Sequence, residues 1–362
     1  MKTKNPFFFV LTALSLLLTP PNVFSADPIV DPASDKAIEQ AIRKVLKKPD
    51  GKLTDKDYEK ITELNLDNLG LRTLTGLSKC RKLKSLFARN NQIENLAGLE
   101  GCREITLLNI HHNFLNDITA LKGCPKLLTI YLKTNHLETL SGLEGCRLLD
   151  HLDARSCRLK NLDALKGNRS LRELSVQDNL LKNVEGLAGC VSLAYLNATE
   201  NKIKRLKGLE GCSNLNEAHL QQNAFEDLTP LANKKQLTDL HASVNLIKSV
   251  LPLKGCVKLR SLHIDHNRVL SLEGLETCTS LRRLSVHANR QLKDLGPLAK
   301  LEFISYLELD NCKISDITPL LNLKSAREIW LRHNPVGGLK TGRKTLDRLK
   351  AALPNCSIRF YQ

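Results

Sequence analysis

Cysteine and histidine are the residues whose types and spacing in this chain suggest chemistry. The chain has 362 residues, of which eleven are Cys and ten are His. Eight of the cysteines share one position of a recurring segment, which reads "GLEGC" at three places: Cys80, Cys102, Cys124, Cys146, Cys190, Cys212, Cys256 and Cys278. A column of thiols can form disulfides, bind a metal ion or fill space, and a column of imidazoles can bind metal or titrate near pH 6.

These residues belong to a repeat that is marked by an asparagine. The stretch "LKSLFARNNQI" has the spacing L-x-x-L-x-(L/A)-x-x-N-x-(I/L), and Asn91 occupies what we call the marker position. The marker position recurs at Leu69, Asn113, Asn135, Cys157, Asn179, Asn201, Asn223, Asn245, Asn267, Asn289, Cys312 and Asn334. Every step is 22 residues except the 23 from Asn289 to Cys312, where the extra residue lies in "NRQLKDL". A fixed period over thirteen turns predicts a repeat architecture.

The pattern resembles that of the leucine-rich repeat proteins over residues 61–339. The 22-residue period, with I-x-x-L-x-G-L after the asparagine, is similar to the internalin and SDS22-like subtype. This resemblance implies an α/β repeat solenoid, an arc with a parallel β-sheet on its concave face and a mostly 3₁₀ convex side. The internalin resemblance also implies protein partners. The SDS22-like resemblance implies phosphatase regulation, an intracellular role that conflicts with the export signal described below.

Simple packing arguments lead to the same architecture. Alternation such as Leu64–Leu66 or Leu307–Leu309 buries two side chains on one face of a short strand. Strands stacked ~4.8 Å apart over thirteen coils form a row roughly 60 Å long, and each coil buries its apolar edge against its neighbours. The marker asparagine can hydrogen-bond the backbone of adjacent turns. Leu69 lacks this polar group, as expected for a terminal coil.

The ends of the chain predict a signal peptide and two caps. Residues 1–25 combine Lys2 and Lys4 with the apolar run 7–18 and a small residue at Ser25, which predicts export to the periplasm or the medium. The run is too short to span a bilayer, so we expect a protein that is not embedded in a membrane. We also expect a monomer. Residues 26–60 form a linker and helical cap, residues 61–339 the repeats, and residues 340–362 a C-terminal helical cap.

The caps should cover the open ends of the stack with amphipathic helices. A helix over residues 35–48 places Ile38, Ile42, Val45 and Leu46 on one stripe. The C-terminal helix carries Leu346, Leu349 and Leu353 on one side.

The cysteine column is interpreted as a space-filling core element. Consecutive members would have parallel Cβ vectors, which disfavours relaxed disulfides, and the spacing lacks a C-x-x-C pair. Asn168 and Lys234 replace cysteine in the same column, so the position does not require a pairing partner. Cys157 and Cys312 occupy the marker position, where a thiol can still donate weakly.

The concave face comprises the residues six, four, two and one before each marker position. Nine of the ten histidines fall there, together with the only tryptophan. Wide, weakly flexible side chains on a preformed surface favour protein binding. The predicted partner-binding residues are Phe87, Tyr131, Tyr195, His219, His241, His263, His287, Tyr306 and Trp330. The alternative is that these wide residues pack side by side merely to cover the sheet.

The predicted function is therefore a non-catalytic scaffold that binds a macromolecular partner through the concave face. The sequence contains no nucleophile elbow, Walker loop, HExxH or dinucleotide fingerprint, so we expect no enzymatic activity and no cofactor. One alternative is a metal or small ligand on the column His219, His241 and His263. Another is an envelope component that binds anionic polymer through basic loops, since the formal net charge is +16. Export argues against nucleic acid as the partner.

Overall fold

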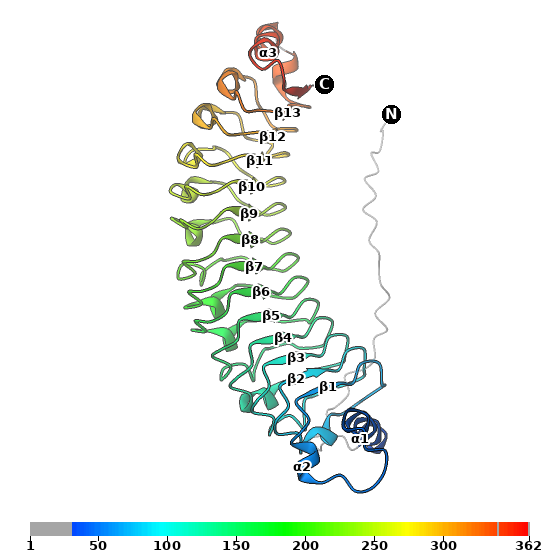
Figure 1. Ribbon diagram of the computed structural model, residues 1–362. Coiled ribbons are helices and arrows are strands. Elements are labelled where there is room, and N and C mark those ends of the chain that lie inside the picture. Colours follow the sequence, from blue (N-terminus) through cyan, green and yellow to red (C-terminus); the bar gives the residue numbers. More distant parts are fainter. Residues whose placement is uncertain (1–30, 339, 361–362) are drawn as a thin grey trace, which may run out of the picture.

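The computed structural model describes residues 31–338 and 340–360, and the signal peptide predicted for residues 1–25 lies outside them. The chain forms an elongated arc with α1 and α2 at one end and α3 at the other (Figure 1). The helices are α1 (Pro32–Leu46), α2 (Asp55–Tyr58) and α3 (Lys340–Ala352). No helix within the described residues is long and apolar enough to cross a bilayer.

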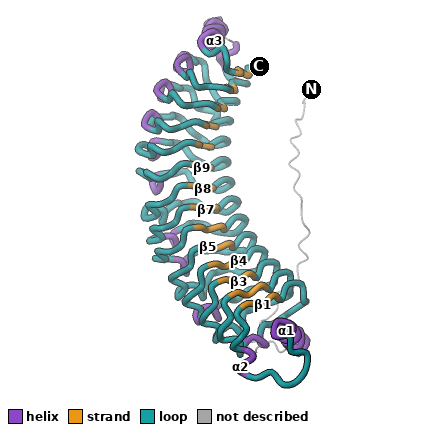
Figure 2. Tube along the Cα trace, in the orientation of Figure 1, coloured by secondary structure: helices purple, strands orange, loops and turns teal. Residues whose placement is uncertain are grey.

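A single parallel sheet of 14 strands runs the length of the arc, with neighbours in chain order and the sheet left open. The strands are β1 (Glu63–Asn65), β2 (Ser85–Phe87), β3 (Leu107–Asn109), β4 (Thr129–Tyr131), β5 (His151–Asp153), β6 (Glu173–Ser175), β7 (Tyr195–Asn197), β8 (Glu217–His219), β9 (Asp239–His241), β10 (Ser261–His263), β11 (Arg283–Ser285), β12 (Tyr306–Glu308), β13 (Glu328–Trp330) and β14 (Ser357–Arg359). Short 3₁₀ segments return most coils on the opposite side (Figure 2). The predicted leucine-rich repeat architecture is confirmed.

The core is a continuous apolar column behind the sheet. Leu64, Leu66, Leu307 and Leu309 are all buried, as the alternation predicted. Each strand exposes its first and third residues more than its middle one, which points inward, as in β4 and β9. The residues six and four before each marker therefore lie on the concave face.

The marker asparagines tie each coil to the preceding one. Asn179 Nδ2 lies 2.9 Å from both the Ala154 and Val176 carbonyls, and its Oδ1 accepts from the Cys157 and Leu159 amides at 3.1 and 2.8 Å. Where cysteine replaces asparagine, the thiol of Cys157 lies 3.2 Å from the Leu132 carbonyl. The expected ladder is thus confirmed, and the thiol acts as a weaker donor at the same place.

The residue before each marker adopts the left-handed conformation in all thirteen coils, with φ between 53° and 61°. These residues include the β-branched Thr134 and Val244, for which this conformation is unfavourable. Each departure costs about 1–2 kcal/mol in isolation. The bend persists because the ladder and inter-coil pairing hold it, as in the 2.9 Å bond from the Val244 amide to the Asp265 carbonyl.

The "GLEGC" motif is explained by the close approach of consecutive coils. Gly98 has φ +105°, and a Cβ there would lie 2.2 Å from the Leu74 carbonyl oxygen of the coil before. The Glu100 carboxylate accepts the Gly98 N–H at 2.8 Å. Cys102 then turns its thiol inward to within 3.5 Å of the Cys80 carbonyl. In this motif, the glycine leaves room for the backbone of the preceding coil, the glutamate accepts the free N–H of the turn, and the cysteine side chain fills space in the core.

The caps cover both ends of the solenoid, with two differences from the prediction. In α1, Ile38 and Ile42 are buried, whereas Val45 is exposed because the buried stripe follows a spacing of four residues from Ser34. In α3, Leu346 and Leu349 are buried as predicted, and Leu353, which directly follows the end of the helix, is also buried. The region after α3 also contributes β14, which pairs in parallel with β13 and was not predicted.

Candidate functional site

The most continuous cluster on the concave face is a stack of four rings on neighbouring strands. The ring centroids of Tyr195 and His219 are 5.6 Å apart, and those of His219 and His241 are 4.6 Å apart. His263 follows at 4.5 Å from His241, with the three imidazole planes inclined by only 19–20° between neighbours. We call Tyr195, His219, His241 and His263 the four-ring stack. The parallel register of β7 to β10 holds it together.

The geometry of the stack bears on the metal alternative. Stacked imidazoles present their faces to one another, so their ring nitrogens do not converge on one point. His219 Nε2 is instead 2.6 Å from Glu217 Oε1, and His263 Nε2 is 3.1 Å from Ser261 Oγ. Among the described residues, no group of three or more His, Cys, Asp or Glu side chains is arranged to hold a metal ion.

His241 lies at the middle of the stack, and its pKa is lowered. Burial is the main cause, and the neighbouring imidazoles of His263 and His219 lower the pKa further. Asp239 and Glu217 act in the opposite direction. Burial and the two neighbouring rings therefore favour the neutral form of His241.

The other predicted site residues fall into smaller groups. Tyr131 packs against His151 with centroids 5.2 Å apart, and His287 packs against His266 at 4.9 Å near the end of the strands. Phe87 stands apart on β2. Tyr306 and Trp330 lie on β12 and β13 near the C-terminal end, each beside an arginine.

The predicted residues are less exposed than free aromatic side chains would be. Only Tyr306, at 40%, counts as exposed, and the other eight are half-buried. The side-by-side packing that the sequence left open is therefore real for the four-ring stack. Such packing also makes the surface rigid, which lowers the entropy cost of binding.

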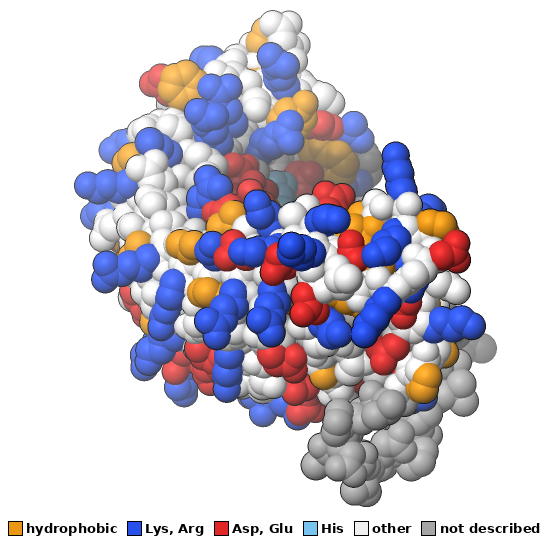
Figure 3. All heavy atoms as spheres, turned by 60° about the horizontal axis from the view of Figure 1, so that its bottom comes forward, with side chains coloured by type: hydrophobic (Ala, Val, Ile, Leu, Met, Phe, Trp, Pro, Cys, Tyr) orange, Lys and Arg blue, Asp and Glu red, His pale blue; other side chains and the backbone are white. Residues whose placement is uncertain are grey.

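The charge of the concave face is the feature that sequence reasoning missed. Its positions carry twelve carboxylates and only five Lys or Arg, although the chain as a whole is strongly basic. The carboxylates are Glu63, Asp67, Asp153, Glu173, Asp178, Glu200, Glu217, Asp239, Asp265, Glu308, Asp310 and Glu328. Figure 3 shows acidic side chains in the hollow, whereas the outer surface carries many Lys and Arg side chains interspersed with further acidic ones.

Three of the five cations on the face are neutralised by carboxylates of the same face. Arg89 pairs with Asp67, and Arg332 pairs with Asp310, both at 2.6 Å. Arg155 pairs with Asp153 at the same distance. The remaining acidity is concentrated on the coils whose markers run from Asn179 to Asn267, which we call the central segment. Its face positions include six carboxylates and four histidines but no Lys or Arg.

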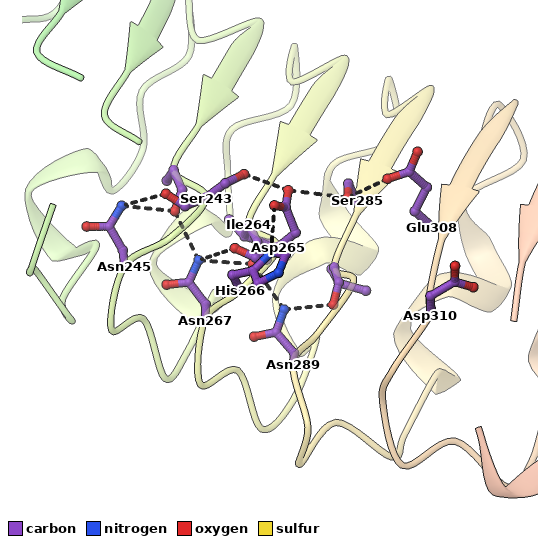
Figure 4. A network of polar contacts seen from close by, with 12 residues as sticks. Ser243, Asn245, Ile264, Asp265, His266, Asn267, Ser285, Asn289, Glu308 and Asp310 are labelled. Atoms are coloured by element: carbon purple, nitrogen blue, oxygen red, sulfur yellow. Dashed lines mark hydrogen bonds and ion pairs between the residues drawn. The ribbon is translucent and has the colours of Figure 1, made fainter. Parts of the chain in front are cut away.

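Asp265 connects the central segment to the next coils through hydroxyl groups. Ser243 Oγ donates to Asp265 Oδ1 at 2.6 Å, and Ser285 Oγ lies 2.8 Å from Glu308 Oε2 and 3.4 Å from Asp265 Oδ1 (Figure 4). One hydroxyl proton serves only one acceptor well, so Ser285 donates mainly to Glu308. The network holds Asp265 and Glu308 in fixed positions on the face.

Comparison with known proteins shows similarity to leucine-rich repeat proteins. A family model described as two copies of leucine-rich repeats matches residues 257–300, and a comparison with curated proteins found no match. An internalin, InlF, from Listeria monocytogenes is 26% identical, with 82% of this chain and 95% of that one covered and a TM-score of 0.62. A leucine-rich repeat protein of Leptospira interrogans is 22% identical, with 79% and 74% covered and a TM-score of 0.70.

A third solved structure relates to the cysteine column. The functional domain of InlJ from Listeria monocytogenes is 19% identical, with 84% of this chain and 74% of that one covered and a TM-score of 0.59. That domain is described as including a cysteine ladder. The chain is thus built of leucine-rich repeats and has the leucine-rich repeat fold, with internalins among its structural neighbours.

Proposed function

We propose that this chain is an exported, non-catalytic scaffold that binds a protein partner through its concave face. Leucine-rich repeat proteins typically act as protein-interaction modules, which is the general expectation for this fold. The observation that carries the specific proposal is the central segment, where the rigid four-ring stack lies among six carboxylates without a compensating Lys or Arg.

The charge of the central segment indicates a cationic partner segment. Lysine or arginine side chains of the partner would meet Glu217 and Asp239, which flank the stack in the first position of β8 and β9. Their apolar stems, or aromatic neighbours, would lie against the rings. Electrostatic complementarity of this kind raises the association rate and selects against anionic partners.

The test is affinity capture from the envelope and medium of the source organism, with the native chain beside a double variant, Glu217→Gln and Asp239→Asn. We expect the double variant to bind the partner about tenfold more weakly, because two complementary charges at the centre of the contact are removed. A matched control, Glu273→Gln with Glu302→Gln, makes the same charge change on exposed loops away from the concave face. Its binding should equal that of the native chain.

Two further readouts sharpen this test. Tyr195→Ala should weaken binding without changing the charge. Binding should also decline as the pH falls and His241 becomes protonated, because its positive charge offsets the carboxylates. The lowered pKa of His241 places this decline below the ordinary range of histidine. A partner held equally by the native chain, the double variant and Tyr195→Ala would place the contact elsewhere and refute the proposal.

A further inference from the structure

The only coil that departs from the 22-residue period has a local break in the pairing between coils. In most coils the amide after the marker donates to the preceding coil, as Arg268 N does to Ile247 O and Lys313 N does to Leu292 O, both at 2.9 Å. Within the described chain, Arg290 N makes no such backbone bond, and neither does Arg158 N in the coil whose marker is Cys157. The turn closes on itself instead, with Leu292 N donating to Asn289 O at 3.0 Å.

A groove of about 950 Å³ opens beside this turn, at the edge of the sheet where the strands end. Its lining includes Lys248, His266, Arg268, His287, Ala288 and Arg290. Ala288 lies between His266 and Asn311 in the column of residues that precede the markers. Its short side chain leaves space that a larger residue would fill. The volume falls within the range of small-molecule sites.

The groove has the opposite charge to the central segment. Arg268 and Arg290 form no ion pair with any carboxylate in the part of the chain that the structure describes. Lys248 is partly neutralised by Glu226 at 2.7 Å, and His266 Nδ1 lies 3.3 Å from Asp265 Oδ2. His287 packs edge-on against His266. Glu226 also interacts electrostatically with Arg268 over a longer distance, but neither guanidinium is held in an ion pair, so the groove keeps a net positive charge.

We propose that this groove binds a phosphate-bearing ligand of about the size of a sugar phosphate. The planar forks of Arg268 and Arg290 match phosphate oxygens in pairs, and the imidazoles can donate to the same dianion. The amides of Gln291 and Asn311, which also line the groove, suit the hydroxyl groups of such an ester. The site is separate from the four-ring stack, so it stands whether or not the concave face binds a protein.

The test is isothermal titration calorimetry of the full chain with inorganic phosphate and with glycerol 3-phosphate, beside sedimentation with vesicles that contain phosphatidylglycerol. Vesicles of phosphatidylcholine serve as the blank. Binding of a soluble probe identifies a free phosphate ester as the ligand source. Binding of the anionic vesicles alone, with the variant dependence given below, identifies a lipid headgroup as the source of the same phosphate.

Three variants separate a built site from general basicity. Arg268→Gln with Arg290→Gln should weaken binding about a hundredfold, roughly tenfold for each guanidinium that no longer bonds the phosphate. Ala288→Gln fills the groove without changing the charge, and Gln222 already occupies the equivalent position with φ 55°. It should weaken binding at least tenfold.

The matched control is Arg158→Gln with Lys202→Gln, which removes two cations from the same repeat position in other coils. It should bind like the native chain at fixed ionic strength, and circular dichroism should show all variants folded. The proposal is overturned if the native chain binds no phosphate probe or if the control loses as much affinity as the arginine variant. It is also overturned if Ala288→Gln binds like the native chain.

Discussion

Two buried columns of side chains run along this solenoid, the marker column and the cysteine column. Both contact the backbone of the preceding coil, but with different functional groups. The marker column and the cysteine column both direct a polar atom at backbone carbonyls of the preceding coil. Asparagine also accepts amide protons, as Asn179 does from Cys157 and Leu159, whereas the thiol offers a single weak donor. The marker column therefore connects coils through hydrogen bonds, while the cysteine column mainly fills volume.

The exceptions in each column support this distinction. In the cysteine column, Lys234 Nζ reaches the Glu210 carbonyl at 2.7 Å, and Asn168 Nδ2 reaches the Cys146 carbonyl at 3.1 Å. Where the marker column lacks asparagine, a concave carboxylate two residues earlier can accept an amide proton from the following coil and so form a different link between coils. Asp310 accepts the Arg332 amide at 2.7 Å, just as Asp67 in the first coil accepts the Arg89 amide. Asp310 belongs to the coil whose marker is Cys312, and Asp67 belongs to the coil whose marker is Leu69.

The largest effect is expected from breaking the marker column. Asn179→Ala should lower the free energy of unfolding by about 4 kcal/mol, because it leaves buried amides and carbonyls without partners. Asn245→Ala should cost only about 2 kcal/mol, since Asn245 Oδ1 has no hydrogen-bond partner to lose. Urea denaturation measures both. Equal losses would mean that the acceptor half of the asparagine contributes nothing.

The cysteine column should be nearly inert to thiol reagents in the folded state. Burial raises the pKa of Cys102, Cys190 and Cys278 to about 12, so the reactive thiolate is at least about a hundredfold scarcer than at a free cysteine. Labelling with a small thiol reagent at pH 8, followed by mass spectrometry, should modify the half-buried Cys356 before any column cysteine. In urea all eleven should react. Rapid modification of several column residues in the native protein would disprove this.

A smaller change in the free energy of unfolding is expected from replacing Lys234, the lysine of the cysteine column. Burial is the main cause of the lowered pKa of Lys234, so the folded state disfavours its charged form. Lys234→Met should therefore raise the unfolding free energy at pH 7, because it removes the cost of burying the charge. The gain should shrink as pH rises toward 10.5, where the unfolded lysine also loses its proton. The neighbouring exposed Lys235→Met should have little effect at any pH, and a similar gain there would contradict the burial argument.

The fold was predictable because each repeat restates the same rule. The alternation around Leu64 and Leu307 and the spacing of the markers determined the strands, the face and the register of the sheet. Ser357–Arg359 escaped prediction because it lies outside the repeat frame, with no marker after it, and is recognisable as a strand only by its pairing with β13. Val45 was misplaced because the end of a short helix tolerates a small rotation of its buried stripe.

The candidate site was only partly predictable. The positions of the rings in the repeat indicated the four-ring stack, and the positions of the charges would have indicated Glu217 and Asp239. The groove could not be derived from residue types, because it depends on the turn at Gln291 and on the short side chain of Ala288. The 23-residue step, which was visible in the sequence, is one place where the regular pairing fails in the structure.

That step behaves like an edge dislocation in a crystal. One extra residue is absorbed within a single turn, and the lattice of coils resumes its spacing on both sides, as the pairing of Arg283 with Tyr306 and of Tyr306 with Glu328 shows. The distortion stays local because every coil is anchored separately to its neighbours. A periodic protein can thus acquire a defect with its own chemistry while the rest of the array is left unchanged.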